Sequence, residues 1–395
     1  MTRIAIVAGE ASGDTLGAGF MRAVKARWPD AEFYGIAGPK MMAEGARSLF
    51  PMEKLSVRGV VEVLKSVPAI WRLRRALGAQ ILRDRPDLFV GIDAPDFNFG
   101  LESRLRSAGI RTVHCVSPSI WLWRPGRIRT IARAADHMLV LFPFEEAIYR
   151  KAGVAATFVG HPLADEMPLE PDRSEARAQL RIGGGAPTIA LLPGSRMGEL
   201  ELHADLMIRT ARELLTRRPD LRFVVPLATR ETRDYFESRL YALEQRELPM
   251  TILFGHARLA LHAADVALVA SGTATLEAAL ARCPMVVTYR LNPLTFHLVK
   301  TGALLPYVGL PNILAGEFVV PELLQDEATP PNLAQALLNW LDNKAAREAL
   351  RRRFAALHAS LACGHEERIA AALAAYLPKA SAVDAPQEQR ARARG

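Results

Sequence analysis

The sequence is poor in cysteine and has no long hydrophobic run. Its three cysteines, Cys115, Cys283 and Cys363, lie far apart and form no CxxC pair, which argues against a structural zinc cluster and a secreted disulfide scaffold. The longest segment without a charged residue, 301–316, contains two prolines and is shorter than the roughly 20 apolar residues of a membrane-spanning helix. We therefore expect a cytoplasmic protein without a transmembrane helix.

Signals for secretion and for nucleic-acid binding are also weak. The first apolar run ends at Glu10 and no small-residue cleavage pattern follows it, so it is predicted to be a strand and not a signal peptide. The formal net charge of +8 would attract nucleic acid, an anionic membrane or a phosphorylated substrate. The arginine clusters lack the aromatic spacing of common RNA-binding motifs, so we rank nucleic acid last among these partners.

Two series of short β-branched runs alternate with helix-length segments. The first covers residues 4–9, 32–38, 88–93, 112–117, 138–143 and 157–160, and the second covers residues 188–195, 221–228, 250–255, 266–271 and 285–290. Runs without polar alternation are typical of parallel strands buried on both faces. The predicted fold class is α/β, with two Rossmann-like, doubly wound parallel-sheet domains that face each other across a cleft.

The domain boundary is predicted from a change in composition. Segment 167–185 is polar and contains two prolines and three consecutive glycines, which is typical of a linker or a domain start. We place one domain at 1–166 and the second at 167–345. Helices are expected over about 332–377, and residues 378–395 are predicted to be disordered because they lack large apolar side chains.

The turn after the first predicted strand reads GEASGD and carries Glu10 and Asp14. Its glycines do not follow the GxGxxG spacing, and the two carboxylates would repel a pyrophosphate. One interpretation makes Glu10 and Asp14 the polar floor of a site for a sugar acceptor. The alternative is a tight turn in which Ser12 or Asp14 caps the following helix.

Two further carboxylates, Asp93 and Asp96, lie just past an apolar strand in the segment GIDAPDFN. A carboxylate at this edge of a sheet can accept the proton of an attacking hydroxyl, which is the one catalytic group that direct displacement at a sugar carbon needs. We favour Asp93 as this base over a structural role. Asp96 is assigned to the acceptor site, with a cap of the next helix as the alternative.

Polar turns of the second domain fit a nucleotide diphosphate. Gly194, Ser195 and Arg196 lie at the end of the run 188–195 and just after it and can offer N–H groups, a hydroxyl and a guanidinium fork to a leaving UDP. An ordinary Pro-Gly turn with an exposed arginine is the alternative.

The segment ASGTATLE repeats this arrangement with Ser271, Gly272, Thr273 and Glu277. Glu277 could accept the ribose hydroxyls while the helix N-terminus faces phosphate, or Thr273 and Glu277 could merely stabilise the helix end. Asn312, in the Pro-rich segment LPNILAG, could reach the donor or form a turn.

Two segments combine tryptophan with arginine. Residues 55–79 place apolar side chains, including Trp71, near helical spacing between cations, and residues 119–133 carry Trp121, Trp123 and several arginines. Such faces can rest on an anionic bilayer or cover a domain core, and the presence of two favours a surface-bound substrate. His114 and His161 have no partner at zinc spacing, and a core histidine is the favoured interpretation of each.

These segments resemble the lipid-A-disaccharide synthase family. GEASGD, GIDAPDFN, VSPSIWLWR, LLPGSR, ASGTATLE, CPMVVTYR and LPNILAG occur here in the order in which that family carries them. The resemblance covers nearly the whole chain up to the C-terminal helices.

The resemblance implies a GT-B glycosyltransferase that uses no metal or other cofactor. It implies transfer from UDP-2,3-diacylglucosamine to 2,3-diacylglucosamine 1-phosphate with inversion, which gives the β-1,6-linked disaccharide 1-phosphate and UDP. The resemblance assigns Asp93 as the base and Arg196, Glu277 and Asn312 to the donor site, so domain 1–166 would bind the acceptor and face the membrane, and domain 167–345 would bind the UDP-sugar. Helices within 346–377 are expected to pack back on the first domain, as in related enzymes.

The expected partners are the two lipid substrates, the anionic inner face of the cytoplasmic membrane and a second copy in a homodimer, with no nucleic acid. Alternative functions remain open. One is another GT-B enzyme that uses UDP-N-acetylglucosamine, such as a cell-wall transferase or an epimerase. The other is a non-catalytic sugar-nucleotide-binding module, which would not need Asp93.

Overall fold

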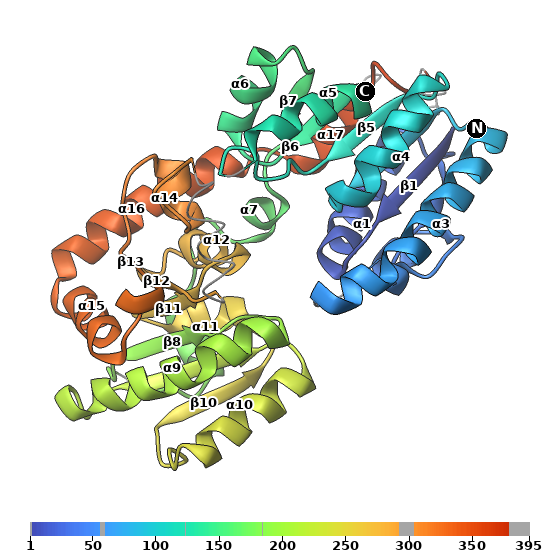
Figure 1. Ribbon diagram of the computed structural model, residues 1–395. Helices are drawn as coiled ribbons and strands as arrows, with labels where there is room; N and C mark the ends of the chain where they lie inside the picture. Colours follow the sequence, from blue (N-terminus) through green and yellow to red (C-terminus); the bar gives the residue numbers. More distant parts are fainter. Residues whose placement is uncertain (1, 56–59, 123, 184, 292–303, 379–395) are drawn as a thin grey trace, which may run out of the picture. The chain divides into compact units, whose positions relative to one another are not determined.

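The computed structural model describes residues 2–55, 60–122, 124–183, 185–291 and 304–378, with the backbone alone for 60–66. These residues form two compact units (Figure 1). The first unit contains residues up to 120, residues 125–162 and residues from 363 onward, and the second contains residues 121–124 and 163–362. The division at 162 and 163 lies slightly before the predicted boundary.

A parallel sheet forms the centre of the first unit. Its strand order is β3-β2-β1-β4-β5-β6-β7. The strands are β1 (Arg3–Ala8), β2 (Glu32–Ile36), β3 (Arg47–Ser48), β4 (Leu88–Ile92), β5 (Thr112–Cys115), β6 (His137–Val140) and β7 (Ala156–Phe158). The predicted strands are confirmed, and β3 is an addition whose two residues are too few to show a pattern.

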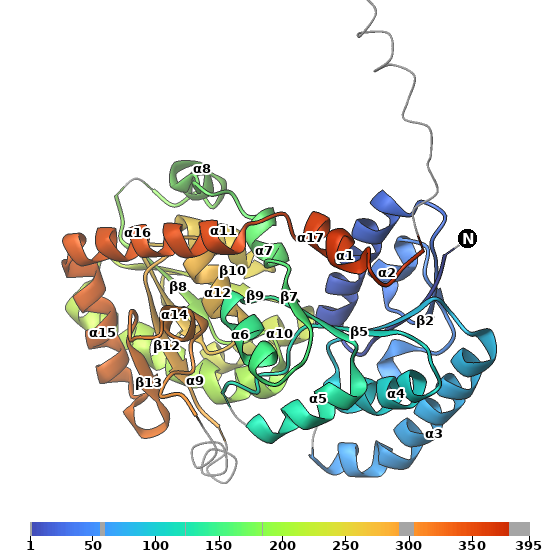
Figure 2. The ribbon, with the colours of Figure 1, turned by 90° about the horizontal axis from the view of Figure 1, so that it is seen from above.

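Helices cover both faces of this sheet. They are α1 (Ala11–Arg27), α2 (Pro39–Ala43), α3 (Val60–Asp84), α4 (Pro95–Ser107), α5 (Ile128–Ala134), α6 (Pro143–Lys151), α7 (Pro162–Glu166, at the boundary between the units) and α17 (His365–Leu373). α1 contacts α2 and α17, whereas α4 contacts α3 and α5. Figure 2 shows α17 beside α1, although more than 300 residues separate them in the sequence.

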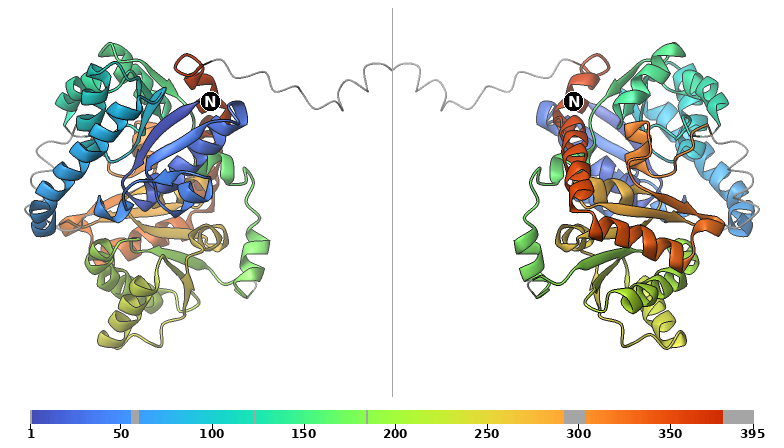
Figure 3. Two further views of the ribbon diagram at one scale, coloured as in Figure 1. Left: turned by 90° about the vertical axis from the view of Figure 1, so that its right-hand side faces the viewer. Right: turned by 90° about the vertical axis from the view of Figure 1, so that its left-hand side faces the viewer.

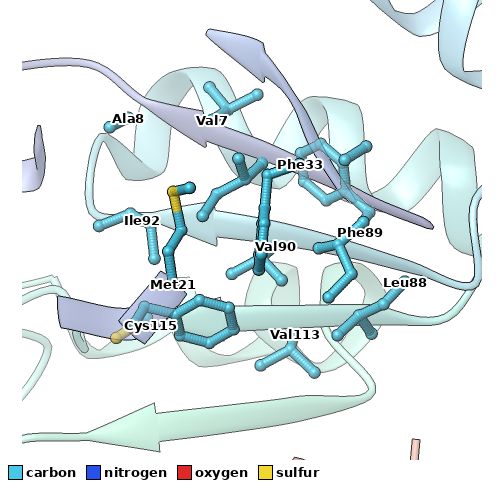
Figure 4. Close-up of a cluster of buried hydrophobic side chains, with 14 of the residues drawn as sticks. Val7, Ala8, Met21, Phe33, Leu88, Phe89, Val90, Ile92, Val113 and Cys115 are labelled. Atoms are coloured by element: carbon cyan, nitrogen blue, oxygen red, sulfur yellow. The ribbon is translucent and has the colours of Figure 1, made fainter. Parts of the chain in front are cut away.

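The core of the first unit is made by the strands that were predicted from their apolar runs. Ile4, Ile6, Phe89 and Val90 are fully buried, as expected for parallel strands with helices on both faces. Figure 4 shows Phe89 and Val90 packed with side chains from β1, α1, β2 and β5. Burial of this contiguous core provides the main stabilisation of the unit.

A second parallel sheet has the order β10-β9-β8-β11-β12-β13. Its strands are β8 (Thr188–Leu192), β9 (Arg222–Leu227), β10 (Met250–Phe254), β11 (Val266–Ala270), β12 (Met285–Tyr289) and β13 (Glu322–Leu324). The predicted fold class is confirmed in that both units contain a doubly wound parallel sheet. Only the short edge strand β13 was not foreseen in this unit.

The helices of the second unit also lie on both faces of the sheet. They are α8 (Arg173–Gln179), α9 (Met197–Arg217), α10 (Arg230–Ala242), α11 (Ala257–Ala263), α12 (Thr273–Leu280), α14 (Leu310–Ala315), α15 (Pro330–Asp342) and α16 (Lys344–Leu361). Short 3₁₀ helices occur at Gln325–Glu327 in this unit and at Met52–Lys54 and Pro125–Arg127 in the first. α9 contacts α10 and α15, whereas α12 contacts α11 and α16. In Figure 3 the orange-red helices α15 and α16 follow one another along this unit.

Two details add to the sequence prediction. The segment predicted to be a linker or a domain start contains α8, whose N-cap Asp172 accepts a hydrogen bond from the Glu175 N–H at 2.9 Å. Of the C-terminal helices, α16 belongs to the second unit and α17 to the first. No helix among the described residues is both long enough and apolar enough to cross a bilayer.

Candidate functional site

The first candidate half-site lies where the strand order of the first sheet reverses. β1 and β4 are neighbours, and the chain continues from them toward opposite edges of the sheet. Ligands of open α/β sheets bind at the carboxyl ends of such strands. The turn after β1 and the turn after β4 touch here, because a Cβ on Gly9 would lie 2.7 Å from the Cβ of Ala94. The structure therefore brings the Glu10 and Asp93 segments together.

Asp93 has an unusual backbone conformation. Asp93 and Ala94 both have positive φ angles, of 50° and 45°, which cost non-glycine residues of order 1–3 kcal/mol each and occur preferentially at functional sites. The turn is held because the Asp93 N–H donates to the Cys115 carbonyl at 2.9 Å and Asn98 Nδ2 donates to the Asp93 carbonyl at 2.8 Å. The side chain of Asp93 is half-buried at the end of β4.

The charge of Asp93 acts on the end of the neighbouring strand. Burial, and secondarily the Asp93 carboxylate, raises the pKa of the Cys115 thiol to about 12. Cys115 is therefore a neutral, fully buried group at physiological pH and cannot act as a nucleophile. Asp93 is left as the ionisable group that the β4 turn presents at this edge of the sheet.

Asp14 has a structural role that the sequence did not reveal. It lies within α1 and is almost completely buried. Its carboxylate accepts hydrogen bonds from the N–H groups of Lys40 at 2.9 Å and Met41 at 3.0 Å. Asp14 thus caps α2 and not its own helix, and both of its oxygens are occupied by this cap. Glu10, by contrast, is exposed at the N-cap of α1.

Asp96 lies at the start of α4, directly after Pro95. Its carboxylate is exposed and forms an ion pair with Arg127. The carboxylates of Asp14 and Asp96 therefore each have a protein partner.

The two histidines considered from the sequence are buried in the first unit. His114 Nδ1 lies 2.7 Å from the Glu102 carboxylate, and both side chains are fully buried, whereas His161 packs against the ring of Phe142. The interpretation of both as core residues agrees with these positions. Among the described residues, no three His, Cys, Asp or Glu side chains lie together as metal ligands would.

The second candidate half-site occupies the equivalent position in the other sheet. β8 and β11 are neighbours at the reversal of strand order. The PGSR turn (residues 193–196) follows β8, and the SGT turn (residues 271–273) follows β11. Both polar turns therefore lie at the carboxyl ends of neighbouring strands. The motifs that were separately predicted to bind a nucleotide therefore follow neighbouring strands at the same edge of the sheet.

The PGSR turn is organised by a carboxylate that sequence analysis missed. Glu199, in the first turn of α9, accepts a hydrogen bond from the Ser195 N–H at 3.2 Å and lies 3.4 Å from Arg196 Nη1. Gly194 has a φ of 120°, and a Cβ there would lie 2.6 Å from the Cβ of Glu199. Only glycine fits this position. Ser195 and Arg196 are exposed.

A neutral histidine fixes the start of α9 to the end of β12. The Arg290 N–H donates to His203 Nε2 at 3.0 Å, so Nδ1 carries the hydrogen and donates to the Glu199 carbonyl at 2.6 Å. Burial lowers the pKa of His203, which is consistent with the neutral ring that these two bonds require. Sequence analysis did not single out His203.

The SGT turn is bound to the segment before α14. The Ser271 hydroxyl donates to the Val308 carbonyl at 2.9 Å, and Thr275 Oγ1 accepts from the Leu310 N–H at 3.1 Å. Gly272, with a φ of 144°, is the N-cap of α12. The alternative in which Thr273 is the N-cap is therefore wrong. Gly272 and Thr273 are both exposed.

Glu277 lies one turn further along α12 and is partly buried. No hydrogen bond joins its carboxylate to another residue in the described part of the chain. Burial raises the pKa of Glu277, and the charge of Arg258 partly opposes this shift. A buried carboxylate that keeps its acceptor capacity is well suited to ligand hydroxyls.

Asn312 lies on α14 and not in a loop, and it is fully buried. Its Oδ1 accepts from the N–H groups of Val319 at 2.8 Å and Val320 at 2.9 Å, and its Nδ2 donates to the Val320 carbonyl at 2.9 Å and to Glu322 at 2.7 Å. Glu322 also accepts from the N–H groups of Val308 and Gly309, each at 2.9 Å. Asn312 therefore shapes the loop beside the SGT turn, and its capacity for hydrogen bonds is already used.

The two tryptophan-arginine segments are described in part. Trp71 on α3 is about half exposed, and Trp121 is partly buried. Trp123 and Arg58 lie outside the described residues. In the segment 55–79, the evidence for a membrane-facing surface therefore comes from the side chains from Val67 onward.

Comparisons with known proteins agree with this arrangement. A family described as lipid-A-disaccharide synthetase matches residues 4–373. The lipid-A-disaccharide synthase of Methylobacillus flagellatus is 54% identical over 377 residues, which are 95% of this chain and all of that protein. That of Chromobacterium violaceum is 55% identical over 359 residues, which are 91% of this chain and 93% of that protein.

Solved structures share the fold at low sequence identity. MurG of Acinetobacter baumannii has a TM-score of 0.57 and 14% identity, over 94% of this chain and 99% of that one. A UDP-GlcNAc 2-epimerase from Neisseria meningitidis, bound to UDP-GlcNAc, has a TM-score of 0.60 and 9% identity, over 95% and 99%. With the family match over nearly its whole length and the two doubly wound sheets of the GT-B fold, the chain belongs to the lipid-A-disaccharide synthase family.

Proposed function

We propose that this protein is an inverting glycosyltransferase of lipid A biosynthesis. It transfers the sugar of UDP-2,3-diacylglucosamine to 2,3-diacylglucosamine 1-phosphate and yields the β-1,6-linked disaccharide 1-phosphate and UDP. The observation that carries the proposal is the left-handed turn at Asp93, which presents a carboxylate at the strand-order reversal of the first sheet. Strained turns of this kind persist where the geometry of a functional group matters.

The proposed reaction is one displacement. The 6-hydroxyl of the acceptor attacks C1 of the donor sugar, the bond from C1 to the UDP oxygen breaks, and the hydroxyl proton passes to Asp93. A single base suffices because inversion needs no covalent intermediate. The neutral, buried Cys115 beside Asp93 supports a carboxylate as the base.

The proposed donor site consists of the two turns of the second sheet. Gly194, Ser195 and Arg196 bind the diphosphate, and Ser271, Gly272 and Thr273 approach it from the neighbouring turn, since both turns offer N–H groups near a helix N-terminus. Glu277 accepts the ribose hydroxyls, a role supported by the fact that no hydrogen bond from a described residue occupies its carboxylate.

Asn312 is proposed to act on the donor indirectly. Its four hydrogen bonds hold the loop that joins the SGT turn, so its loss would displace that turn.

The acceptor is proposed to bind at Glu10 and Asp93, because the turns that carry them touch. Asp96 lies at the rim of this site, where its ion pair with Arg127 can exchange for a ligand contact. Asp14 is proposed to position this site indirectly, because its carboxylate caps α2 through the N–H groups of Lys40 and Met41.

The protein is further proposed to associate peripherally with the anionic inner face of the cytoplasmic membrane. Support comes from the exposed Val67 and Trp71 on α3 and from the arginines around them. A homodimer is part of the proposal as well, and sedimentation equilibrium of the purified protein tests it.

The test is release of UDP by purified protein in detergent, without added metal. Release should require both UDP-2,3-diacylglucosamine and the acylated acceptor. Asp93→Asn should lower turnover by about 10²–10⁴-fold while UDP binding is retained. The matched control is Asp30→Asn. Asp30 is exposed and lies just before β2, at the amino end of that strand.

Other outcomes contradict the proposal in separable ways. Unchanged turnover in Asp93→Asn removes Asp93 as the base. Turnover of UDP-N-acetylglucosamine in place of the acylated donor keeps the donor site but rejects the lipid substrate. Binding of UDP without any turnover favours a non-catalytic module.

A further inference from the structure

A pocket of about 410 Å³ lies between α3 and α4 in the first unit. It is lined by Trp71, Arg74, Arg75, Gly100, Leu101 and Arg104. The two helices pack side by side, so the pocket is formed by regular secondary structure. None of the candidate residues for donor or acceptor binding lines it.

Two glycines let the arginines lie close against the opposite helix. A Cβ on Gly100 of α4 would lie 2.5 Å from Arg74 Nη1 of α3, and a Cβ on Gly78 of α3 would lie 3.2 Å from Arg104 Nη1 of α4. Arg74 also donates a hydrogen bond to the Asp96 carbonyl at 3.3 Å. The guanidinium groups of Arg74 and Arg104 therefore lie against the opposite helix, and less side-chain entropy is lost when they bind a ligand.

Three arginines give this pocket its positive charge. Within the described part of the chain, Arg74, Arg75 and Arg104 form no ion pair with a carboxylate. Arg75 instead lies 5.5 Å from the ring centroid of Trp71. Three like charges around one pocket repel each other and favour an anion, and planar guanidinium groups are matched to phosphate oxygens.

An apolar surface adjoins the pocket. Val67 and Trp71 are each 51% exposed, and their spacing of four residues places them on the same side of α3. Arg75 follows one turn later on that side. Tryptophan beside arginine on an exposed helix is typical of the headgroup level of a bilayer. A ligand for this surface therefore combines phosphate with an apolar part.

We propose that the α3–α4 pocket binds the phosphate of an anionic phospholipid headgroup while Val67 and Trp71 enter the interfacial layer. The inference rests on the proposed membrane association and adds a defined headgroup site to it. General attraction of a basic protein to an anionic surface depends on net charge and not on one pocket. The position of the arginines in the pocket should therefore matter as well as their number.

The experiment measures binding of the full-length protein to vesicles by co-sedimentation, with phosphatidylcholine alone and with phosphatidylcholine containing phosphatidylglycerol. The pocket variant is Arg74→Gln/Arg75→Gln/Arg104→Gln. Its charge-matched control is Arg209→Gln/Arg212→Gln/Arg230→Gln, on exposed positions of α9 and α10. At about 1 kcal/mol for each arginine at an anionic surface, the pocket variant should bind phosphatidylglycerol vesicles about 100-fold more weakly, and the control should stay within about threefold of wild type.

A second variant tests geometry without removing charge. Gly100→Ala retains all three arginines but forces the Arg74 guanidinium to move, because the new Cβ would lie 2.5 Å from it. It should weaken binding to phosphatidylglycerol vesicles severalfold. Circular dichroism confirms that each variant is folded, and Gly100→Ala alone decides the question where the triple variant fails to fold.

Three results would overturn the inference. Equal losses in the pocket variant and its control would mean that net charge alone attracts the vesicles. Wild-type binding by Gly100→Ala would mean that the pocket geometry is irrelevant. Calorimetric titration with inorganic phosphate that is as tight as vesicle binding would assign the pocket to a soluble phosphate. The UDP-release assay is independent of these readouts, so a failure of the proposed reaction is recognised separately.

Discussion

Replacing Asn312 by alanine removes four hydrogen bonds at one buried position. The bonds to the N–H and C=O of Val320 are fully buried, and leaving each partner unsatisfied costs about 1–3 kcal/mol. The bonds to Val319 and Glu322 are part-buried and contribute about 0.5–1.5 kcal/mol each. We expect the substitution to lower the free energy of unfolding of the second unit by about 3–9 kcal/mol.

The assay is thermal unfolding followed by far-UV circular dichroism. A loss of this size in a unit of this length should lower the Tm by roughly 6 °C or more. The control is Asn339→Ala, at an exposed position on α15, which should change the Tm by no more than about 2 °C. A similarly small change for Asn312→Ala would refute the structural role and favour direct contact with the donor.

Other predictions follow from the same contacts. Burial raises the pKa of Glu277, so its ionised form opposes folding above the unfolded pKa of about 4.3. Glu277→Gln should therefore make the unliganded protein more resistant to urea at pH 7, and this gain should disappear below about pH 4. The same substitution should weaken UDP binding in calorimetry. Burial lowers the pKa of His203, so the folded protein becomes less stable as the pH falls below about 6.5. Urea titrations at pH 7 and pH 5 should show a smaller loss of unfolding free energy in His203→Gln than in wild type. A Cβ at Gly91 would lie 2.2 Å from Glu102 Oε1, so Gly91→Ala should cost about 1–3 kcal/mol in the same denaturation assay.

Much of the fold could be predicted from the sequence because buried parallel strands have a strong local pattern. Residues 88–93 and 266–271 are apolar runs without polar alternation, and both become central strands next to a strand-order reversal. β3 and β13 have two and three residues, which are too few to show any periodicity. Their positions depend on tertiary pairing at the sheet edges.

The roles of individual polar residues were harder to predict. Asp14 looks like a cap of its own helix, yet its partners are the N–H groups of Lys40 and Met41 in another helix. Asn312 looks like a loop residue, and its partners include Glu322 on β13. A sequence pattern shows that a carboxylate or amide is near a turn, but not which distant backbone groups it will satisfy.

The two half-sites occupy equivalent places in their sheets and differ mainly in charge. The turns of the first sheet present the carboxylates of Glu10 and Asp93, which would repel a diphosphate but can accept protons from sugar hydroxyls. The turns of the second sheet present helix N-termini and the exposed Arg196, which favour a diphosphate. The one carboxylate described in these turns, Glu199, lies 3.4 Å from Arg196 Nη1, which offsets its charge. The sign of charge therefore supports the acceptor at the first sheet and the donor at the second. Exchanging Arg196 for glutamate should accordingly abolish UDP binding, whereas glutamine should weaken it, because the first substitution reverses the charge and the second only removes it.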